Sequence, residues 1–271
     1  MAVWELAALY ESQRGGRSVT TVLETMGAIV KTMKSSVTAA LKGTEYADRI
    51  VGAQASQVFE AEAAGRLLPT GVLNTVIAWT AAMMAAKSAM GVIVAAPTAG
   101  SCGVLPGTLL ASAHVMGLDE DVCVKAMMTA GLVGVFIARG ATFAAEVCGC
   151  QAECGAASAM AAAGLVSLMD GTTQQAMDAA SVALQNVLGL ICDPVADRVE
   201  VPCLGKNVMA ASNAVAAANM ILSGFDVVIP LDETIAAMYE VGEMLPSELH
   251  CTGLGGLSVT DTAKVIAQRI P

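Results

Sequence analysis

Three cysteines far apart in the sequence constrain this chain most, because each lies where a helix has to break. Cys192 and Cys203 each have a proline within two residues, and Cys150 follows a glycine. A helix does not run straight through such positions, so loops there can turn several thiols towards one point. The sequence contains no Cys-x-x-Cys pair, the usual spacing of zinc ribbons and thioredoxin-type sites. Three thiols on separate loops suit a cuboidal iron–sulfur cluster with one iron left open.

The other cysteines are less informative, since cysteine is often simply a small buried apolar residue. Cys148 and Cys154 lie close enough in sequence to Cys150 to compete with it as ligands. Cys102 and Cys123 are interpreted as packing residues. Cys251 remains an alternative ligand for a resting state.

Composition favours an all-α fold. Apolar residues make up 55% of the 271 residues and aromatic residues only 3%. Alanine and glycine let helices approach closely, and methionine fills the gaps between them. We therefore expect a single compact helical domain spanning 1–271, with buried Ala/Met/Gly-rich central helices and cluster-binding loops. Residues 1–17 would form a peripheral N-terminal helix and link.

Capping signals and apolar periodicity define the expected helices. Capping boxes are predicted at Thr21 and Thr172, and Asp119 and Asp232 are predicted to cap two further helices. The expected helical ranges are 2–13, 21–43, 46–65, 70–95, 104–115, 119–135, 155–169, 172–189, 207–222, 232–242 and 260–268.

A second informative stretch is Thr98–Gly103, with two glycines and two hydroxyl side chains just before a helix. A loop at the positive end of a helix can present backbone N–H groups to an anion. Many glycine-rich turns are only turns. Taken alone, the stretch leaves open both a structural turn and a seat for a carboxylate.

The segments around these loops resemble the iron–sulfur-dependent L-serine dehydratases, in particular the type whose catalytic region is a separate α chain. The resemblance runs from about Thr21 to the C-terminus, and the three cysteine motifs have the family's order and spacing. The matching segments are Ala96–Gly107, Gly149–Glu153, Leu190–Val195, Val201–Cys203 with Asn207–Ala210, and Thr252–Gly256.

The resemblance implies β-elimination of L-serine to pyruvate and ammonia. In that family a [4Fe–4S] cluster would be held by Cys150, Cys192 and Cys203, and its open iron would act as a Lewis acid on the substrate carboxylate and β-hydroxyl. The lysines lie in no recognisable pyridoxal phosphate motif, the usual alternative for this chemistry. The implied partners are an amino acid substrate, a separate β chain and further copies in an oligomer. The substrate-binding residues implied are Thr98, Gly100, Ser101, Gly103 and Asn207.

The general base is not evident from the sequence. The two histidines are His114, in an apolar stretch typical of core residues, and His250, beside a glycine-rich segment. His250 and Lys34 are the candidates, and Ser101 or a residue of a partner chain are further alternatives.

Two segments depart from the family pattern and leave the substrate open. Residues 45–51 lack the Gly-Gly-Asp run, and residues 139–145 lack the Asn-Ala-Ser-type run. If both line the pocket, the cluster could act on another 2-amino or 2-hydroxy acid with a β-leaving group, such as threonine or cysteine.

Charge and hydropathy exclude some classes of partner. The net charge is −10 and the basic residues are scattered, which disfavours nucleic acid and anionic membranes. The N-terminus lacks the pattern of a signal peptide, so we expect a cytoplasmic protein with reduced thiols. Uncharged stretches at 67–86 and 88–118 are long enough to span a membrane. A helical membrane or binding protein with incidental cysteines is therefore the alternative class.

Overall fold

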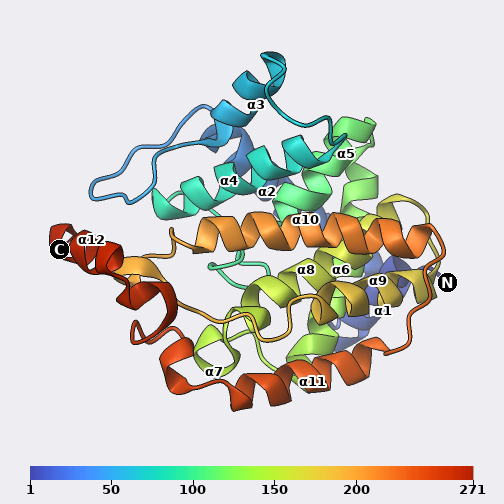
Figure 1. The fold of residues 1–271 in the computed structure, drawn as a ribbon. Coiled ribbons are helices and arrows are strands. Elements are labelled where there is room, and N and C mark those ends of the chain that lie inside the picture. Colours follow the sequence, from blue (N-terminus) through green and yellow to red (C-terminus); the bar gives the residue numbers. More distant parts are fainter. Residues whose placement is uncertain (271) are drawn as a thin grey trace.

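The helix at the centre of the fold, α8 (Ala156–Leu168), consists of small and apolar residues and buries every side chain except that of Ser167. In the computed structural model, which describes residues 1–270, α8 packs against α6 (Glu120–Gly140), α9 (Thr173–Gln185) and α10 (Cys203–Leu222). Figure 1 shows α10 crossing the molecule beside α8, and its first residue is Cys203.

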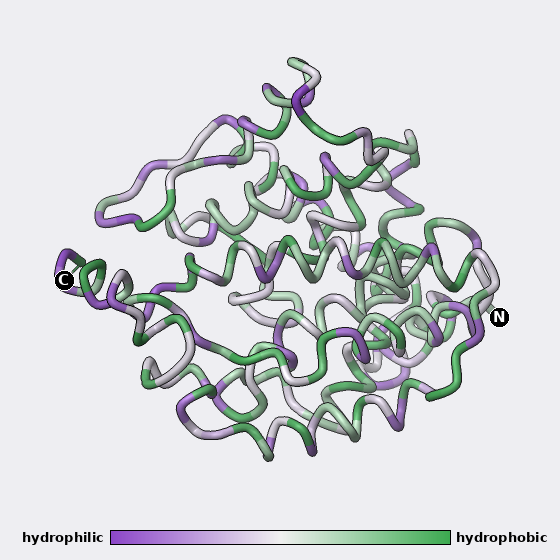
Figure 2. Tube along the Cα trace, viewed as in Figure 1, coloured by the Kyte–Doolittle hydropathy of each residue, from purple (hydrophilic) through white to green (hydrophobic). Residues whose placement is uncertain are grey.

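The remaining helices surround this centre, and the described residues contain no strand, which confirms the expected all-α fold. The one bridge of strand type pairs Cys192 with His250. Polar residues concentrate on the peripheral segments, whereas the central helices are mainly apolar (Figure 2). The other elements are α1 (Val3–Gly15), α2 (Val19–Ala40), α3 (Ala55–Ala63), α4 (Leu73–Ser88), α5 (Ala111–Met116), α7 (Ala145–Cys148), α11 (Leu231–Met244) and α12 (Asp261–Arg269), the π-helical turns η1 (Pro106–Leu110) and η2 (Gln151–Gly155), and the 3-10 turns η3 (Val195–Asp197), η4 (Ser247–Leu249) and η5 (Gly256–Val259).

Small residues permit the close packing that the composition predicts. A Cβ on Gly164 of α8 would lie 2.7 Å from Cδ1 of Leu109, and a Cβ on Gly107 would lie 2.7 Å from Cα of Thr80. At such distances only glycine fits without displacing a neighbour. The buried Ala/Met/Gly-rich helices of the prediction are therefore present. α1 also contributes to this packing, since it lies against α6 and buries Val3.

Some predicted helix ends are confirmed and others are wrong. The capping box at Thr172 is present, and Asp119 precedes α6 as its N-cap. The box predicted at Thr21 is wrong, because the side chain of Ser18 caps α2 and accepts from the N–H of Thr21. The cap predicted at Asp232 is also wrong: Pro230 is the N-cap of α11, and Asp232 lies in the first turn.

The helix predicted at 46–65 is reduced to α3, and residues 42–54 form a loop. A distant acceptor explains the difference. The buried carboxylate of Glu200 accepts hydrogen bonds from the hydroxyl of Tyr46 (2.7 Å) and from the N–H groups of Ile50 (3.0 Å) and Val51 (3.2 Å). Backbone N–H groups paired in this way cannot serve a helix.

Three further helices differ in extent from the prediction. The range predicted at 70–95 is helical only over α4, and Met90 adopts a left-handed conformation just beyond its end. The range 104–115 contains the π-helical turn η1 before α5. α10 begins at Cys203 rather than Asn207, so this cysteine occupies the first turn of a helix rather than a loop.

One helix, α6, is long and apolar enough to cross a membrane by length and composition. Its most apolar window has a mean hydropathy of 1.7 and is 61% buried within the fold, against α8 and other helices. Buried core helices pass the same test. The two uncharged stretches noted in the sequence do not form such a helix among residues 1–270.

Candidate active site

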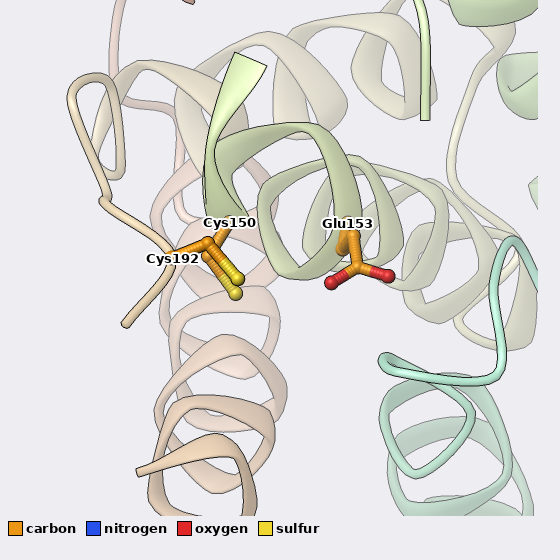
Figure 3. Close-up of side chains that lie close together, drawn as sticks. All are labelled: Cys150, Glu153 and Cys192. Carbon is orange, nitrogen blue, oxygen red and sulfur yellow. The ribbon is translucent and has the colours of Figure 1, made fainter. Parts of the chain in front are cut away.

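Two of the three predicted ligands converge directly (Figure 3). Sγ of Cys150, Sγ of Cys192 and a carboxylate oxygen of Glu153 all lie within 4.8 Å of one another. Cys150 immediately precedes the π-helical turn η2, and that turn carries Glu153 three residues later. π-helical turns recur at functional sites because the wider turn re-aims side chains. Here the turn directs a thiol and a carboxylate to the same space.

The thiols of Cys150, Cys154 and Cys192 affect one another's pKa values. Sγ of Cys154 is 3.7 Å from Sγ of Cys150. Hydrogen bonds from the thiols of Cys154 and Cys192 lower the pKa of Cys150 well below its ordinary value, and the same bonds raise the pKa values of the two donors. One negative charge is therefore most stable on Cys150 in this buried group, the state in which cysteine binds metals.

The third predicted ligand, Cys203, lies in the first turn of α10, outside the group of ligand atoms within 4.8 Å of one another. Burial, and then charge on Cys150, raises the pKa of the Cys203 thiol to about 12. Asn207, one turn further on, donates from Nδ2 to the carbonyl of Cys203 (2.9 Å) and contacts Sγ of Cys154 at 3.7 Å. The structure thus brings Cys150 and Cys192 together, and Asn207 links the backbone of Cys203 to the neighbouring thiol of Cys154.

The Thr98–Gly103 loop borders the same site through Asn207 and Glu153. Asn207 donates to the carbonyl of Gly100 (2.8 Å) and accepts from the N–H of Gly103 (3.2 Å). Oγ1 of Thr98 donates to Glu153 (2.7 Å) and contacts Oγ of Ser101 (2.9 Å). All five predicted substrate-binding residues therefore lie together beside the thiols.

The loop differs in one respect from the free N–H groups that its sequence suggests. The N–H of Ser101 donates to Oγ1 of Thr98 (3.1 Å), and that of Gly103 is occupied by Asn207. Ser101 is also fully buried. Along the described backbone, the N–H groups of Ala99 and Gly100 have no acceptor.

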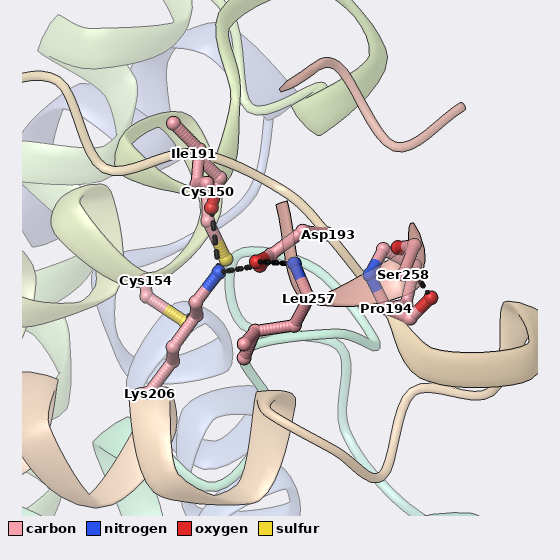
Figure 4. A network of polar contacts seen from close by, with 8 residues as sticks. All are labelled: Cys150, Cys154, Ile191, Asp193, Pro194, Lys206, Leu257 and Ser258. Atoms are coloured by element: carbon pink, nitrogen blue, oxygen red, sulfur yellow. Dashed lines mark hydrogen bonds and ion pairs between the residues drawn. The ribbon is translucent and has the colours of Figure 1, made fainter. Parts of the chain in front are cut away.

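A polar network ties the Cys192 segment to the rest of the site (Figure 4). Nζ of Lys206 donates to the carbonyl of Ile191 (2.7 Å) and to Oδ1 of Asp193 (2.5 Å). Oδ2 of Asp193 in turn accepts from the N–H of Leu257 (2.8 Å), and Oγ of Ser258 donates to the carbonyl of Pro194 (2.8 Å). This network holds the backbone on both sides of Cys192, and the sequence prediction assigned it no part.

Sequence reasoning also missed two charged side chains at the site. It included Glu153 only as the end of the matching segment Gly149–Glu153 and did not consider Lys87, the one charge at the end of α4. Nζ of Lys87 donates to the carbonyl of Val199. Burial lowers the pKa of Lys87, an effect opposed by the nearby acidic groups Cys102, Cys203, Glu200 and Glu153. The sequence signal for Lys87 was its position as the single charged residue at the end of a long uncharged stretch.

The remaining cysteines differ in their surroundings. Sγ of Cys148 faces α11 and lies 3.9 Å from the carbonyl of Tyr239. Cys102 is fully buried within the Thr98–Gly103 loop, and Cys123 packs on α6. Cys251 is only half-buried, and its side chain hydrogen-bonds that of Cys192.

The two predicted base candidates have different positions. The backbone of His250 pairs with Cys192, but Nε2 of its ring contacts the carbonyl of Gly242 at 3.1 Å. Lys34 is exposed on α2, in a groove lined also by Lys31 and Lys42 and beside Cys123. The structure brings His250 next to a site thiol and leaves Lys34 on the α2 surface.

Comparison with known proteins identifies the family. A model of the family described as serine dehydratase alpha chain matches residues 1–258. The chain belongs to this family. The match begins before Thr21, where the sequence resemblance begins, and includes every cysteine of the site.

Relatives of this family include both separate alpha chains and a longer protein. The chain is 38% identical to the probable L-serine dehydratase alpha chain of Bacillus subtilis over 92% of its own length and 83% of that protein. It is 35% identical to the L-serine dehydratase alpha chain of Peptoniphilus asaccharolyticus over 97% of its length and 91% of that protein. With L-serine dehydratase 1 of Escherichia coli it shares 36% identity over 70% of its length, but only 42% of the longer protein.

Proposed function

We propose that this chain is the catalytic α chain of a lyase that eliminates the β-hydroxyl group of L-serine and yields pyruvate and ammonia. The observation that carries the proposal is the convergence of Cys150 and Cys192 beside the Thr98–Gly103 loop, with Cys203 linked to them through Asn207, in a member of the serine dehydratase alpha chain family.

The donor set fits a [4Fe–4S] cluster. Its members are buried thiols from three separate segments, and those of Cys150 and Cys192 lie within 4.8 Å of each other. Iron–sulfur clusters are held by cysteine thiolates, and soft sulfur ligands select such metals over hard cations. We assign Cys150, Cys192 and Cys203 as the ligands, and a reducing cytoplasm would keep them available. When bound through three cysteines, the cluster supplies an open iron with Lewis-acid character.

The chain's own residues would orient the substrate. The N–H groups of Ala99 and Gly100 have no acceptor within the described residues and can hold a carboxylate. Asn207 fixes this loop against α10, so the loop and the thiols keep one relative position. Loss of the α-proton and of the β-hydroxyl group leaves an enamine, which hydrolyses to pyruvate and ammonia. His250 stays a proposal for the base, as does a residue of the partner chain.

A separate β chain is the proposed partner. Two relatives are named as alpha chains, and the chain spans less than half of the longer Escherichia coli relative. Such a difference is expected where two chains perform what one longer chain does elsewhere.

The test is an anaerobic assay of the iron-loaded chain, with and without its β chain. We expect pyruvate from L-serine, brown colour and roughly four irons per chain. Threonine, cysteine and 2-hydroxy acids are assayed in parallel, since the departures at 45–51 and 139–145 leave the choice among them open. A fully loaded complex that releases no pyruvate from L-serine would contradict the proposal.

A matched pair of variants tests the ligands. Cys192→Ser should lose iron, visible absorbance and activity together. Cys123→Ser removes an equally buried thiol on α6 and should keep all three. Equal iron content in the two variants would show that Cys192 is not a ligand.

A further inference from the structure

Two opposite charges face the thiols without neutralising each other. Glu153 and Lys87 are near enough for each to shift the other's pKa. Yet within residues 1–270 neither side chain forms an ion pair. Glu153 is held by Thr98 instead, and Lys87 by the carbonyl of Val199. Burial raises the pKa of Glu153 to about 7 and lowers the pKa of Lys87, so a ligand that carries both charges would stabilise the ionised form of each side chain.

The loop is shaped around the carboxylate of Glu153. A Cβ on Gly100 would lie 2.7 Å from Oε1 and 2.9 Å from Oε2, so only glycine lets the loop backbone approach it this closely. The neighbouring N–H groups of Ala99 and Gly100 are open. Lys87 lies beside the segment that leads into Cys203, since its Nζ donates to the carbonyl of Val199.

A free 2-amino acid carries an ammonium and a carboxylate on one carbon, whereas a 2-hydroxy acid carries only the carboxylate. Charge-assisted hydrogen bonds in a partly buried site discriminate strongly between such pairs. We propose that Glu153 receives the α-ammonium group of the substrate and that Lys87 attracts its carboxylate, so that the site selects 2-amino acids over 2-hydroxy acids. This inference rests on the proposed function and specifies its substrate class. Glu153 is thus a specificity-determining residue.

The test compares two molecules that differ only in carrying an α-ammonium or an α-hydroxyl group and that have no β-leaving group. L-Alanine and L-lactate are titrated calorimetrically into the anaerobic, iron-loaded chain with its β chain. The wild type should bind L-alanine at least about tenfold more tightly, the value of one hydrogen bond to a charged group. Glu153→Gln, which keeps the shape of the side chain, should bring the two dissociation constants to within about threefold of each other.

Lys87→Met should act differently, because both ligands carry the carboxylate. It should weaken the binding of L-alanine and of L-lactate by a similar factor of about ten and preserve the ratio of their dissociation constants. Glu146→Gln, an exposed carboxylate four residues before Cys150, and Lys34→Met are the matched controls. Both should leave the two dissociation constants unchanged.

A second variant leaves the carboxylate in place. Thr98→Val removes the 2.7 Å hydrogen bond that fixes Glu153 and should lower the preference for L-alanine about threefold. In turnover, Glu153→Gln should raise KM for L-serine more than it lowers kcat. An unchanged alanine-to-lactate ratio in Glu153→Gln would overturn the inference while leaving the proposed function intact. A wild type that binds L-alanine selectively but releases no pyruvate from L-serine would contradict the proposed function and leave the inference about Glu153 intact.

Discussion

The two walls of the site are built differently. The inner wall, residues 98–110 and 150–155, is embedded in the core, and its side chains pack against α4, α8 and α10. The outer wall, residues 191–202 and 250–259, consists of short turns with several exposed apolar side chains, such as Leu254 and Val259. In this wall the non-glycine residues Ala196, Asp197 and Cys251 also adopt left-handed backbone conformations. Each such conformation costs about 1–2 kcal/mol.

Packing therefore fixes Cys150 and Glu153, whereas polar contacts fix Cys192. Regions with few buried apolar contacts open with a lower free energy than the core does. The outer wall is thus the part of the site that can yield when metal or substrate enters. Substitutions in the two walls should differ in whether they change global unfolding or only local opening.

The largest effect is expected in the inner wall. Gly107→Ala would place a methyl group 2.7 Å from Cα of Thr80, and the surrounding helices are too well packed to move freely. The free energy of unfolding should fall by about 3 kcal/mol, measured by urea denaturation. Gly131→Ala is the control, because that helical glycine on α6 has nothing within 4 Å of the added methyl. It should stabilise the protein by up to about 1 kcal/mol. Equal effects at the two positions would refute tight packing of the inner wall.

A smaller global effect is expected in the outer wall. Lys206→Met leaves the carboxylate of Asp193, which is 4% exposed, without its cation. In a rigid core this would be severely destabilising, but the outer wall can open to water, so we expect a loss of only about 1–2 kcal/mol. Hydrogen exchange should rise mainly in residues 191–202 and 250–259, and iron loading should weaken.

The control for this comparison is Lys264→Met. Lys264 forms an exposed pair with Asp261 at 3.7 Å, and such pairs contribute little. If Lys206→Met instead lowered global stability as much as Gly107→Ala, the outer wall would have to be counted as part of the core.

The same division explains what the sequence could predict. α8, α9 and the capping box at Thr172 were predicted because their signals are local: small apolar residues, a hydroxyl and a glutamine three positions on. The meeting of the cysteine loops was predicted because proline and glycine mark the breaks. The contact between Thr98 and Glu153 joins residues 55 positions apart, and Glu200 holds residues about 150 positions away. No periodicity reports such pairs, so residues 46–54 of the loop were wrongly predicted as helix and Glu153 was given no role.

The smallest predicted effect tests that long-range tether through pH. Burial, and then the hydrogen bond to Glu200, raises the pKa of Tyr46 to about 12. Because the folded state favours the neutral phenol, the tether contributes fully below the unfolded pKa of about 10 and is lost as pH rises through about 12. Tyrosinate absorbance should show one late-titrating residue of the three tyrosines, absent in Tyr46→Phe. Glu200→Gln should lower the pKa of Tyr46 only part of the way, since burial remains, while hydrogen exchange at Ile50 and Val51 increases. A Tyr46 that titrates with the other tyrosines would mean that the loop does not rest on Glu200, and that this side of the site is as open as the outer wall.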